Sequence, residues 1–201
     1  MRTGSPHPYS TNMFCVIPII QNPLYDYSSL STAIAKAGMN QHHTLATIAL
    51  QSNDEEAYTF AESLVDFYGK HVKITLEDRP TTTYERANRF FNAACKAYQK
   101  SGDPKFPMIY FDPTYRPTSQ FWLDNLQANY FRSGAPEVFG NFVNGLPVGP
   151  IILNMHYVNT STLREFLPAN TQWRNFLAAE MNVKNAPEAT ESLTNLLKPT
   201  L

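Results

Sequence analysis

The chain is poor in cysteine, in clustered charge and in long apolar runs. Its 201 residues include two cysteines, Cys15 and Cys95, which lie far apart within apolar stretches. This pattern favours buried free thiols of a reducing compartment over a disulfide framework. Sixteen basic and 17 acidic residues give a formal net charge of −1 and form no block, so no nucleic-acid interface is expected. No run approaches the roughly 20 apolar residues that span a bilayer, and we expect a cytoplasmic protein.

Several common site motifs are also missing. There is no G-x-x-x-x-G-K-[ST] phosphate loop and no G-x-G-x-x-G turn, which excludes P-loop and dinucleotide-binding proteins. No H-E-x-x-H, paired C-x-x-C or G-x-S-x-G occurs, which argues against a zinc site and a serine hydrolase. His42 and His43 are adjacent, and adjacent residues of a strand point to opposite faces. We therefore interpret this pair as polar residues at a strand edge rather than as metal ligands.

The chain does contain a regular alternation of apolar and amphipathic segments. Apolar runs predict strands at 13–20, 43–50, 71–77 and 106–111, with later strand-like runs at 136–143 and 148–158. Helical spacing predicts helices at 28–38, 51–70, 81–102 and 119–134, a further one from 159, and weak helical character at 188–198. This order predicts an α/β domain over 13–180, with a mostly parallel sheet and helices on both faces. Residues 1–12 are interpreted as an extended arm without the apolar core of a signal peptide, and 181–201 as a tail.

Asp112 stands directly after the fourth expected strand. Pro113, Thr114 and Pro117 follow it and hold the chain out of regular structure. A loop would account for these residues, and so would a strand-end site for a metal or a phosphate. Because open α/β sheets bind ligands beyond the carboxyl ends of their strands, the pattern favours a site. Asp124, inside the next expected helix, is interpreted as a surface charge.

The segment FPMIYFDPTYRPTSQFWLDNLQANYFRSG, residues 106–134, resembles glycosyltransferase-like proteins of the GT-A fold that bacteriophages encode. Their pattern at this point is an apolar strand, Glu-Pro-Asp, two residues, Pro, then Trp-Leu-Asp and a helix that ends in Tyr. Here the motif is Asp-Pro-Thr, and Pro117, Trp122 and Tyr130 keep the register. The stretches VIPIIQN, RANRFF, VFGNFV and GPIILNMHYV resemble other elements of that group, so the resemblance covers about residues 13–167.

This resemblance implies a single GT-A-like domain that transfers a sugar from a nucleotide-sugar donor to an unknown acceptor. In such proteins a pair of carboxylates at a strand end holds Mn²⁺ or Mg²⁺ against the diphosphate. Asp112 would be the metal ligand, with Thr114 in the second ligand position. The residues that would contact the nucleotide are Pro18, Asn22, Asp54, Asn88 and Arg116.

Two roles are left open by the resemblance. Arg116 would stand in for the cation if no metal binds, or it is a solvated loop arginine. The candidates for the catalytic group on the acceptor side are His156 and Glu137, and His156 would also suit a metal or phosphate contact. A hydrogen-bonded strand histidine is the alternative for His156.

Thr114 also keeps a second function open. Its neutral hydroxyl is a poor metal ligand, so the chain could be a catalytically degenerate descendant of the fold, without a cofactor, that serves as a structural or binding module. Such a module would contact other protein subunits through residues 1–12 and 181–201, for instance in a virion. The expected location is the host cytoplasm for a phage-encoded enzyme and the virion for a structural module.

Overall fold

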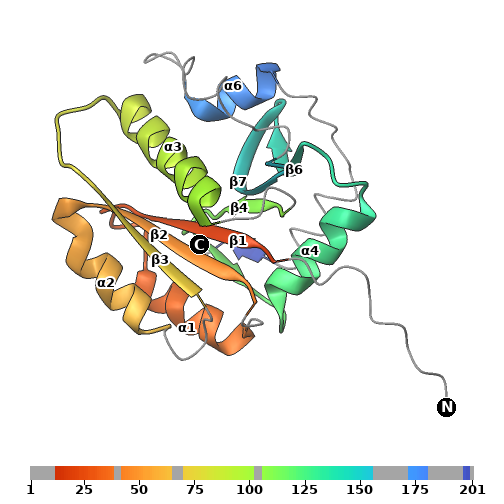
Figure 1. Cartoon of the computed structure of the whole chain (residues 1–201), viewed down its shortest axis with the longest axis horizontal. Coiled ribbons are helices and arrows are strands. Elements are labelled where there is room, and N and C mark those ends of the chain that lie inside the picture. The colour runs from red at the N-terminus through yellow and green to blue at the C-terminus, as the bar shows by residue number, and fades with distance from the viewer. Residues whose placement is uncertain are drawn as a thin grey trace.

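The structure is a computed structural model that describes residues 12–38, 42–64, 70–101, 106–155, 172–180 and 197–199 (Figure 1). The helix expected from residue 159, most of the arm and most of the tail lie outside these residues. Among the described helices, none combines the length and the apolar character that crossing a bilayer requires.

The domain is built on a six-stranded sheet with the order β3-β2-β1-β4-β7-β6. Its strands are β1 (Phe14–Ile19), β2 (Thr44–Leu50), β3 (Lys70–Leu76), β4 (Met108–Tyr110), β6 (Val138–Val143) and β7 (Leu146–Leu153). Strands β1 to β4 run parallel, and β7 is antiparallel to both β4 and β6. The predicted α/β class with a mostly parallel sheet is therefore confirmed.

Helices cover both faces of this sheet (Figure 1). Helices α1 (Tyr27–Ala37), α2 (Asp54–Glu62, after a 3₁₀ turn at Gln51–Asn53) and α4 (Trp122–Arg132) pack on one face, and α3 (Thr83–Ser101) and α6 (Trp173–Glu180) pack on the other. The alternation of β1 explains the two layers, because Cys15 and Ile17 enter the first core while Phe14 and Val16 enter the second. Cys15 and Cys95 are buried free thiols, as predicted.

Local signals account for the ends of α1. The side chain of Asp26 accepts a hydrogen bond from the Ser29 N–H at 2.8 Å, so this aspartate caps the helix. Gly38 ends the helix as predicted, with a φ of 67° and its N–H donated to the Ile34 carbonyl.

The largest differences from the sequence prediction involve two short strands. Residues after Asp112 were expected to be irregular, but β5 (Tyr115–Pro117) pairs antiparallel with β8 (Leu197–Pro199). The expected helical character at 188–198 is therefore wrong at 197 and 198. Leu197 is 1% exposed, so burial of its side chain and strand pairing outweigh a weak local helical preference. Helix α6 was not predicted, and α2 ends at Glu62, well before the expected end at 70.

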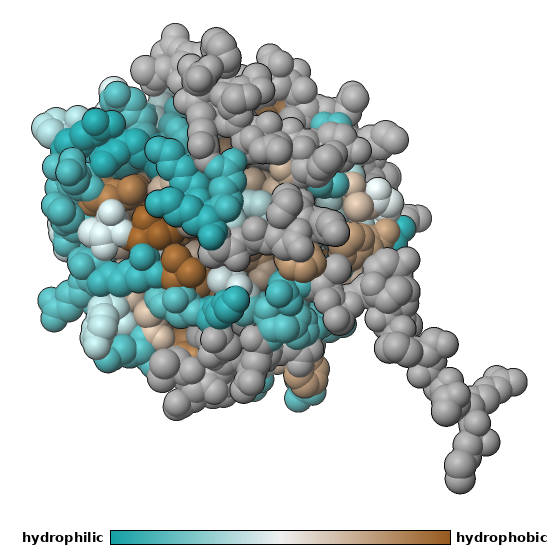
Figure 2. Space-filling view, viewed as in Figure 1, coloured by the Kyte–Doolittle hydropathy of each residue, from teal (hydrophilic) through white to brown (hydrophobic). Residues whose placement is uncertain are grey.

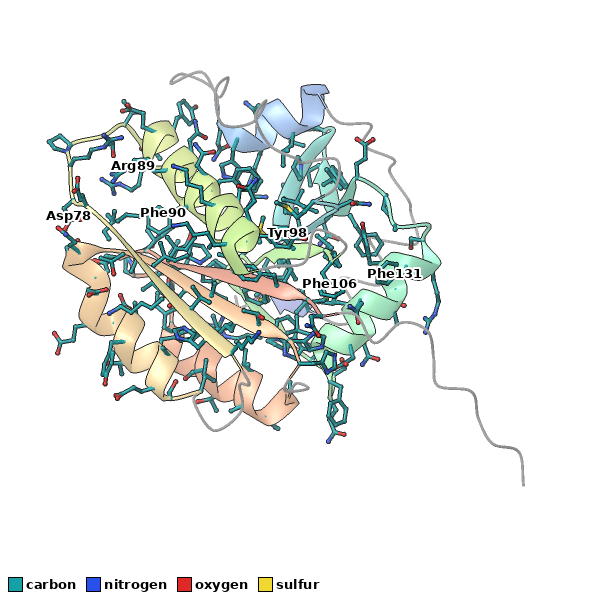
Figure 3. The ribbon with its side chains drawn as sticks, in the orientation of Figure 1. Asp78, Arg89, Phe90, Tyr98, Phe106 and Phe131 are labelled. Carbon is teal, nitrogen blue, oxygen red and sulfur yellow. The ribbon has the colours of Figure 1, made fainter. Side chains whose placement is uncertain are left out.

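Side chains of α3 hold the connections on either side of that helix (Figure 3). Arg89 donates a hydrogen bond to the Glu77 carbonyl at 2.8 Å, before the helix. Tyr98 donates to the Phe106 carbonyl at 2.6 Å, just before β4. Helix α3 therefore returns the chain from the outer strand β3 to β4.

This return creates a reversal of strand order between β1 and β4. Strands β1, β2 and β3 follow one another outward, whereas β4 adds to the other side of β1. Open α/β sheets bind ligands outside the carboxyl ends of the strands at such a reversal. The residues at this point are Ile20 and Gln21 after β1, and Phe111 and Asp112 after β4.

Candidate functional site

Asp112 and Thr114 form a closed turn at the end of β4. The Asp112 Oδ1 atom accepts hydrogen bonds from the Thr114 N–H at 3.0 Å and from the Thr114 hydroxyl at 2.7 Å. One carboxylate oxygen of Asp112 thus stabilises the turn. Thr114, in the second ligand position, donates its hydroxyl hydrogen bond to Asp112, which is the first expected ligand. Because Mn²⁺ and Mg²⁺ prefer carboxylate oxygens, this pair does not fit a chelated divalent cation.

Arg116 lies close to this turn but holds the backbone. Its guanidinium donates to the carbonyls of Pro113 at 2.6 Å, Tyr115 at 2.9 Å and Asp26 at 2.8 Å. Its Nε donates to the Ser29 hydroxyl at 3.2 Å. These four contacts hold β5 against the start of α1. Arg116, which was predicted to contact a phosphate, therefore stabilises the fold here.

A different arginine, Arg174 of α6, interacts electrostatically with Asp112. Its Nη1 donates to the carbonyls of Pro147 at 3.0 Å and Gly149 at 3.2 Å. Tyr110 pairs with Ile151, so continuing that register by two residues puts Gly149 level with Asp112. Burial lowers the pKa of the half-buried Arg174, and the nearby Asp112 carboxylate opposes that shift. Arg174 was not predicted as a site residue, because α6 was not predicted.

Tyrosines complete the surroundings of Arg174 and Asp112. Burial and the Asp112 charge raise the pKa of Tyr25, whereas Arg174 lowers it. Tyr110 is buried, and burial raises its pKa. Tyr115 packs on Gly149, where a Cβ would lie 2.8 Å from the ring and where φ is 68°, so this position requires glycine.

An open crevice continues from Tyr25 along the carboxyl ends of β1 and β2. Its main part has a volume of about 770 Å³ between α1 and α2, and Tyr25, Gln21, Ser52 and Asn53 are among its lining residues. A neighbouring pocket of about 420 Å³ is also lined by Gln21, Ser52 and Asn53. Its further lining residues include Asp78, Arg79 and Arg86. Each of the two volumes falls in the range of small-molecule sites.

The predicted nucleotide contacts Pro18 and Asn22 serve the local backbone. The Pro18 carbonyl accepts a hydrogen bond from the Tyr27 hydroxyl at 3.0 Å. The Asn22 Oδ1 accepts from the Leu24 N–H at 3.0 Å and shapes the turn after β1. Both residues lie at the carboxyl edge, as expected, but their polar atoms bind the chain itself.

Asp54 and Asn88 also have protein partners. Asp54 accepts a hydrogen bond from the Thr75 hydroxyl at 2.8 Å and pairs with the Lys73 ammonium at 2.9 Å. These two partners lower its pKa. The buried Asn88 accepts from the Trp173 N–H at 2.8 Å and so fixes the start of α6, next to Arg174.

Of the two catalytic candidates, Glu137 does not join this group. Glu137 precedes β6, and the pairs Val138 with Leu153 and Leu153 with Met108 put it level with the start of β4. It therefore lies at the amino edge of the sheet, opposite Asp112. His156 lies outside the described residues.

A second polar cluster occupies the amino edge. The Nε2 atoms of His42 and His43 lie 3.7 Å and 3.3 Å from Asp124 Oδ1, and the two rings are 4.1 Å apart. The prediction that the two histidines face opposite sides is wrong, because they precede β2 instead of lying within it. Asp124 likewise faces the histidines and is not a free surface charge.

This cluster contains the residue types of a metal site, but its proton arrangement does not fit one. The Nδ1 of the fully buried His43 accepts a hydrogen bond from the Met13 N–H at 3.0 Å. In neutral histidine the proton then sits on Nε2, which faces Asp124 and has no lone pair for a metal. Burial lowers the pKa of His43 to about 4, so the ring is neutral. The cluster is a packing contact between β1, β2 and α4.

A third feature lies away from both edges. A groove of about 580 Å³ between β3 and α3 has Val72, Ile74 and Leu76 on its floor, with Arg89 and Lys96 among its basic neighbours. Figure 2 shows apolar surface along β3 framed by hydrophilic residues. Because this groove follows an outer strand and not the strand ends, we do not include it in the site.

No known family profile matches the chain, and no curated protein matches its sequence. Its structure is similar to mouse xyloside xylosyltransferase 1 (11% identity, TM-score 0.44, 84% of this chain and 75% of that one). It is also similar to S. aureus TarS 1–349 in complex with UDP (16% identity, TM-score 0.43, 68% of this chain and 38% of that one). A third similar structure is the glycosyltransferase GlyE of Streptococcus pneumoniae TIGR4 (13% identity, TM-score 0.49, 92% of this chain and 43% of that one). The chain thus spans less than half the length of the last two. Such distant likenesses assign no substrate or activity to it.

Proposed function

We propose that the protein binds a nucleoside-diphosphate sugar at the carboxyl edge of its sheet and transfers the sugar to an acceptor. The observation that carries this proposal is the reversal of strand order between β1 and β4, with Asp112, Arg174 and an open crevice beside it. The resemblance of residues 106–134 to phage glycosyltransferase-like proteins supports the same assignment.

Several lining residues suit the base and the sugar of such a donor, and its diphosphate has to lie away from the three carboxylates of the main part, Asp26, Glu55 and Glu56. Gln21 and Asn53 offer hydrogen-bonding groups for a base and a ribose, whereas the N–H and the hydroxyl of Ser52 already donate to Asp78. Tyr25 offers an aromatic face where the crevice approaches Asp112 and Arg174. Transfer would break the anomeric carbon–oxygen bond to the diphosphate and form one to the acceptor oxygen, whose proton goes to a base. His156 stays a prediction for that base.

A second candidate function rests on Thr114. Its hydroxyl donates to Asp112 at 2.7 Å where a second carboxylate would hold a metal. This observation favours a catalytically degenerate structural or binding module, and contacts through residues 1–12 and 181–201, in an assembly such as a virion, stay part of that proposal.

Titration calorimetry with UDP, GDP and ADP tests the donor binding on which the transferase proposal depends. The transferase proposal expects one of them to bind, and Gln21→Trp, which fills both parts of the crevice, should weaken that binding by roughly tenfold or more. Gln99→Trp, at an exposed position of α3, is the matched control and should bind as the parent does. If no nucleoside diphosphate binds under any condition, the transferase proposal is refuted and the structural module is favoured.

A further inference from the structure

The donor's diphosphate needs positive charge, because it would lie next to the Asp112 carboxylate. In the GT-A proteins that this chain resembles, a divalent cation supplies that charge. The Asp112–Thr114 turn does not fit one, since Oδ1 already accepts two hydrogen bonds and Thr114 donates one of them from its hydroxyl. The His42–His43–Asp124 cluster lies at the opposite edge of the sheet and presents a protonated Nε2.

Arg174 is the arginine that the fold holds at the level of Asp112, whereas Arg79 and Arg86 line the neighbouring pocket and Arg116 binds backbone carbonyls. Its Nη1 binds the carbonyls of Pro147 and Gly149, at the level of Asp112. A guanidinium has three further N–H groups, on Nη2 and Nε. Arginine is also the side chain best suited to bidentate contact with phosphate.

The position of Arg174 is fixed by a chain of contacts from α3. The Asn88 side chain accepts the Trp173 N–H at 2.8 Å. The Trp173 ring stacks on Phe91 with centroids 4.3 Å apart and planes 2° apart. The Arg174 guanidinium in turn lies 4.4 Å over the Trp173 ring. A cation held in this way needs little reorganisation when an anion binds.

We propose that Arg174 takes the place of a divalent cation, so that the nucleoside diphosphate binds without metal. This inference rests on the proposed function. Asp112 then offsets the charge of Arg174 and holds the turn, and Arg116 keeps β5 in place. Binding should consequently be strong in the presence of a chelator and should fall as ionic strength rises.

The test is titration of the full chain with UDP, or with whichever diphosphate binds, in EDTA and separately in Mn²⁺. The expected result is the same affinity in both. Arg174→Met removes the charge and should weaken binding by roughly tenfold or more, and Arg174→Lys, which keeps the charge without the planar fork, should weaken it severalfold. Arg132→Met, at an exposed position of α4, is the control and should leave binding unchanged.

Each other outcome identifies what fails. Binding that requires Mn²⁺ and is lost in EDTA overturns the inference and leaves the proposed function standing. A folded Arg174→Met variant with parental affinity also overturns the inference. If Arg174→Met does not fold, which circular dichroism would show, the EDTA titration of the parent and the Arg174→Lys variant still decide. The absence of binding to any nucleoside diphosphate refutes the proposed function itself.

Discussion

The two edges of the sheet use similar polar residues in different ways. At the amino edge His43 is fully buried, its Nδ1 accepts a backbone N–H and its Nε2 faces Asp124. At the carboxyl edge Asp112 and Arg174 are half-buried, and Tyr25, which interacts with both, lines an open crevice. A carboxylate beside a histidine therefore stabilises the fold at one edge, whereas at the other edge a carboxylate and an arginine interact with a tyrosine that lines the crevice. Residue type alone does not separate these two roles, whereas burial and the direction of each hydrogen bond do.

The largest effect is expected at the amino edge and concerns pH. The pKa of His43 falls from 6.5 to about 4 on folding. The unfolded chain thus binds a proton more readily, and stability is lost as the pH falls from about 6.5 towards 4. At 1.36 kcal/mol per pKa unit, the loss in unfolding free energy is of the order of 3 kcal/mol.

Urea denaturation of the parent and of His43→Asn, at pH values of about 7 and 4.5, checks this prediction. Asparagine can still accept the Met13 N–H but does not titrate, so the variant should lose markedly less stability between the two pH values. His42→Asn, next to it and partly exposed, should keep the parental pH dependence. Equal pH dependence in the parent and His43→Asn would show that His43 is not the buried neutral base described above.

A smaller effect is expected from two glycines of the β6–β7 hairpin region. Gly149 and Gly145 have φ values of 68° and 78°, but an added Cβ meets the Tyr115 ring only at Gly149, 2.8 Å away. Alanine should cost about 1 kcal/mol at either position through backbone strain, and roughly 1 kcal/mol more at Gly149 through displacement of Tyr115. Thermal unfolding of both variants measures the difference. Equal losses would mean that Tyr115 moves aside freely and does not hold the carboxyl edge.

The smallest effect is expected for Asp54→Asn. Asp54 belongs to the predicted nucleotide contacts, yet Lys73 and Thr75 bind its carboxylate and it does not line the crevice. The affinity for the bound diphosphate should change by roughly twofold or less, because an exposed ion pair contributes little. Calorimetry alongside Gln21→Trp makes the measurement. A tenfold loss in Asp54→Asn would restore the sequence prediction for this residue.

The strands and helices were predictable because their signals are local. A continuous apolar run in β1 and apolar spacing in α1 identify these elements within a dozen residues, and Gly38 marks the end of α1. The order of the elements then predicts the carboxyl edge, and with it the place of Asp112. Each of these patterns describes one helix or strand. It predicts the element correctly where the apolar residues of the pattern are the ones that become buried.

The side chains of the site were less predictable because their partners are distant in sequence. Arg174 follows Asp112 by about 60 residues and belongs to a helix with little local signal. The partner of His43 is Asp124, on helix α4, so adjacency to His42 suggested the wrong geometry. Arg116 was predicted to contact a phosphate because its segment was expected to be a loop. Instead, this segment is the strand β5, which pairs with β8.

The pairing of β5 with β8 also has a consequence for the order of folding. Tyr115–Pro117 joins a strand that lies about 80 residues further along the chain, and contacts of such separation form late because loop closure must precede them. During synthesis, Asp112 would leave the ribosome long before Leu197 and Pro199 could reach β5. The core layers can therefore assemble first, and the turn that carries Asp112 would gain its supporting strand among the last steps of folding.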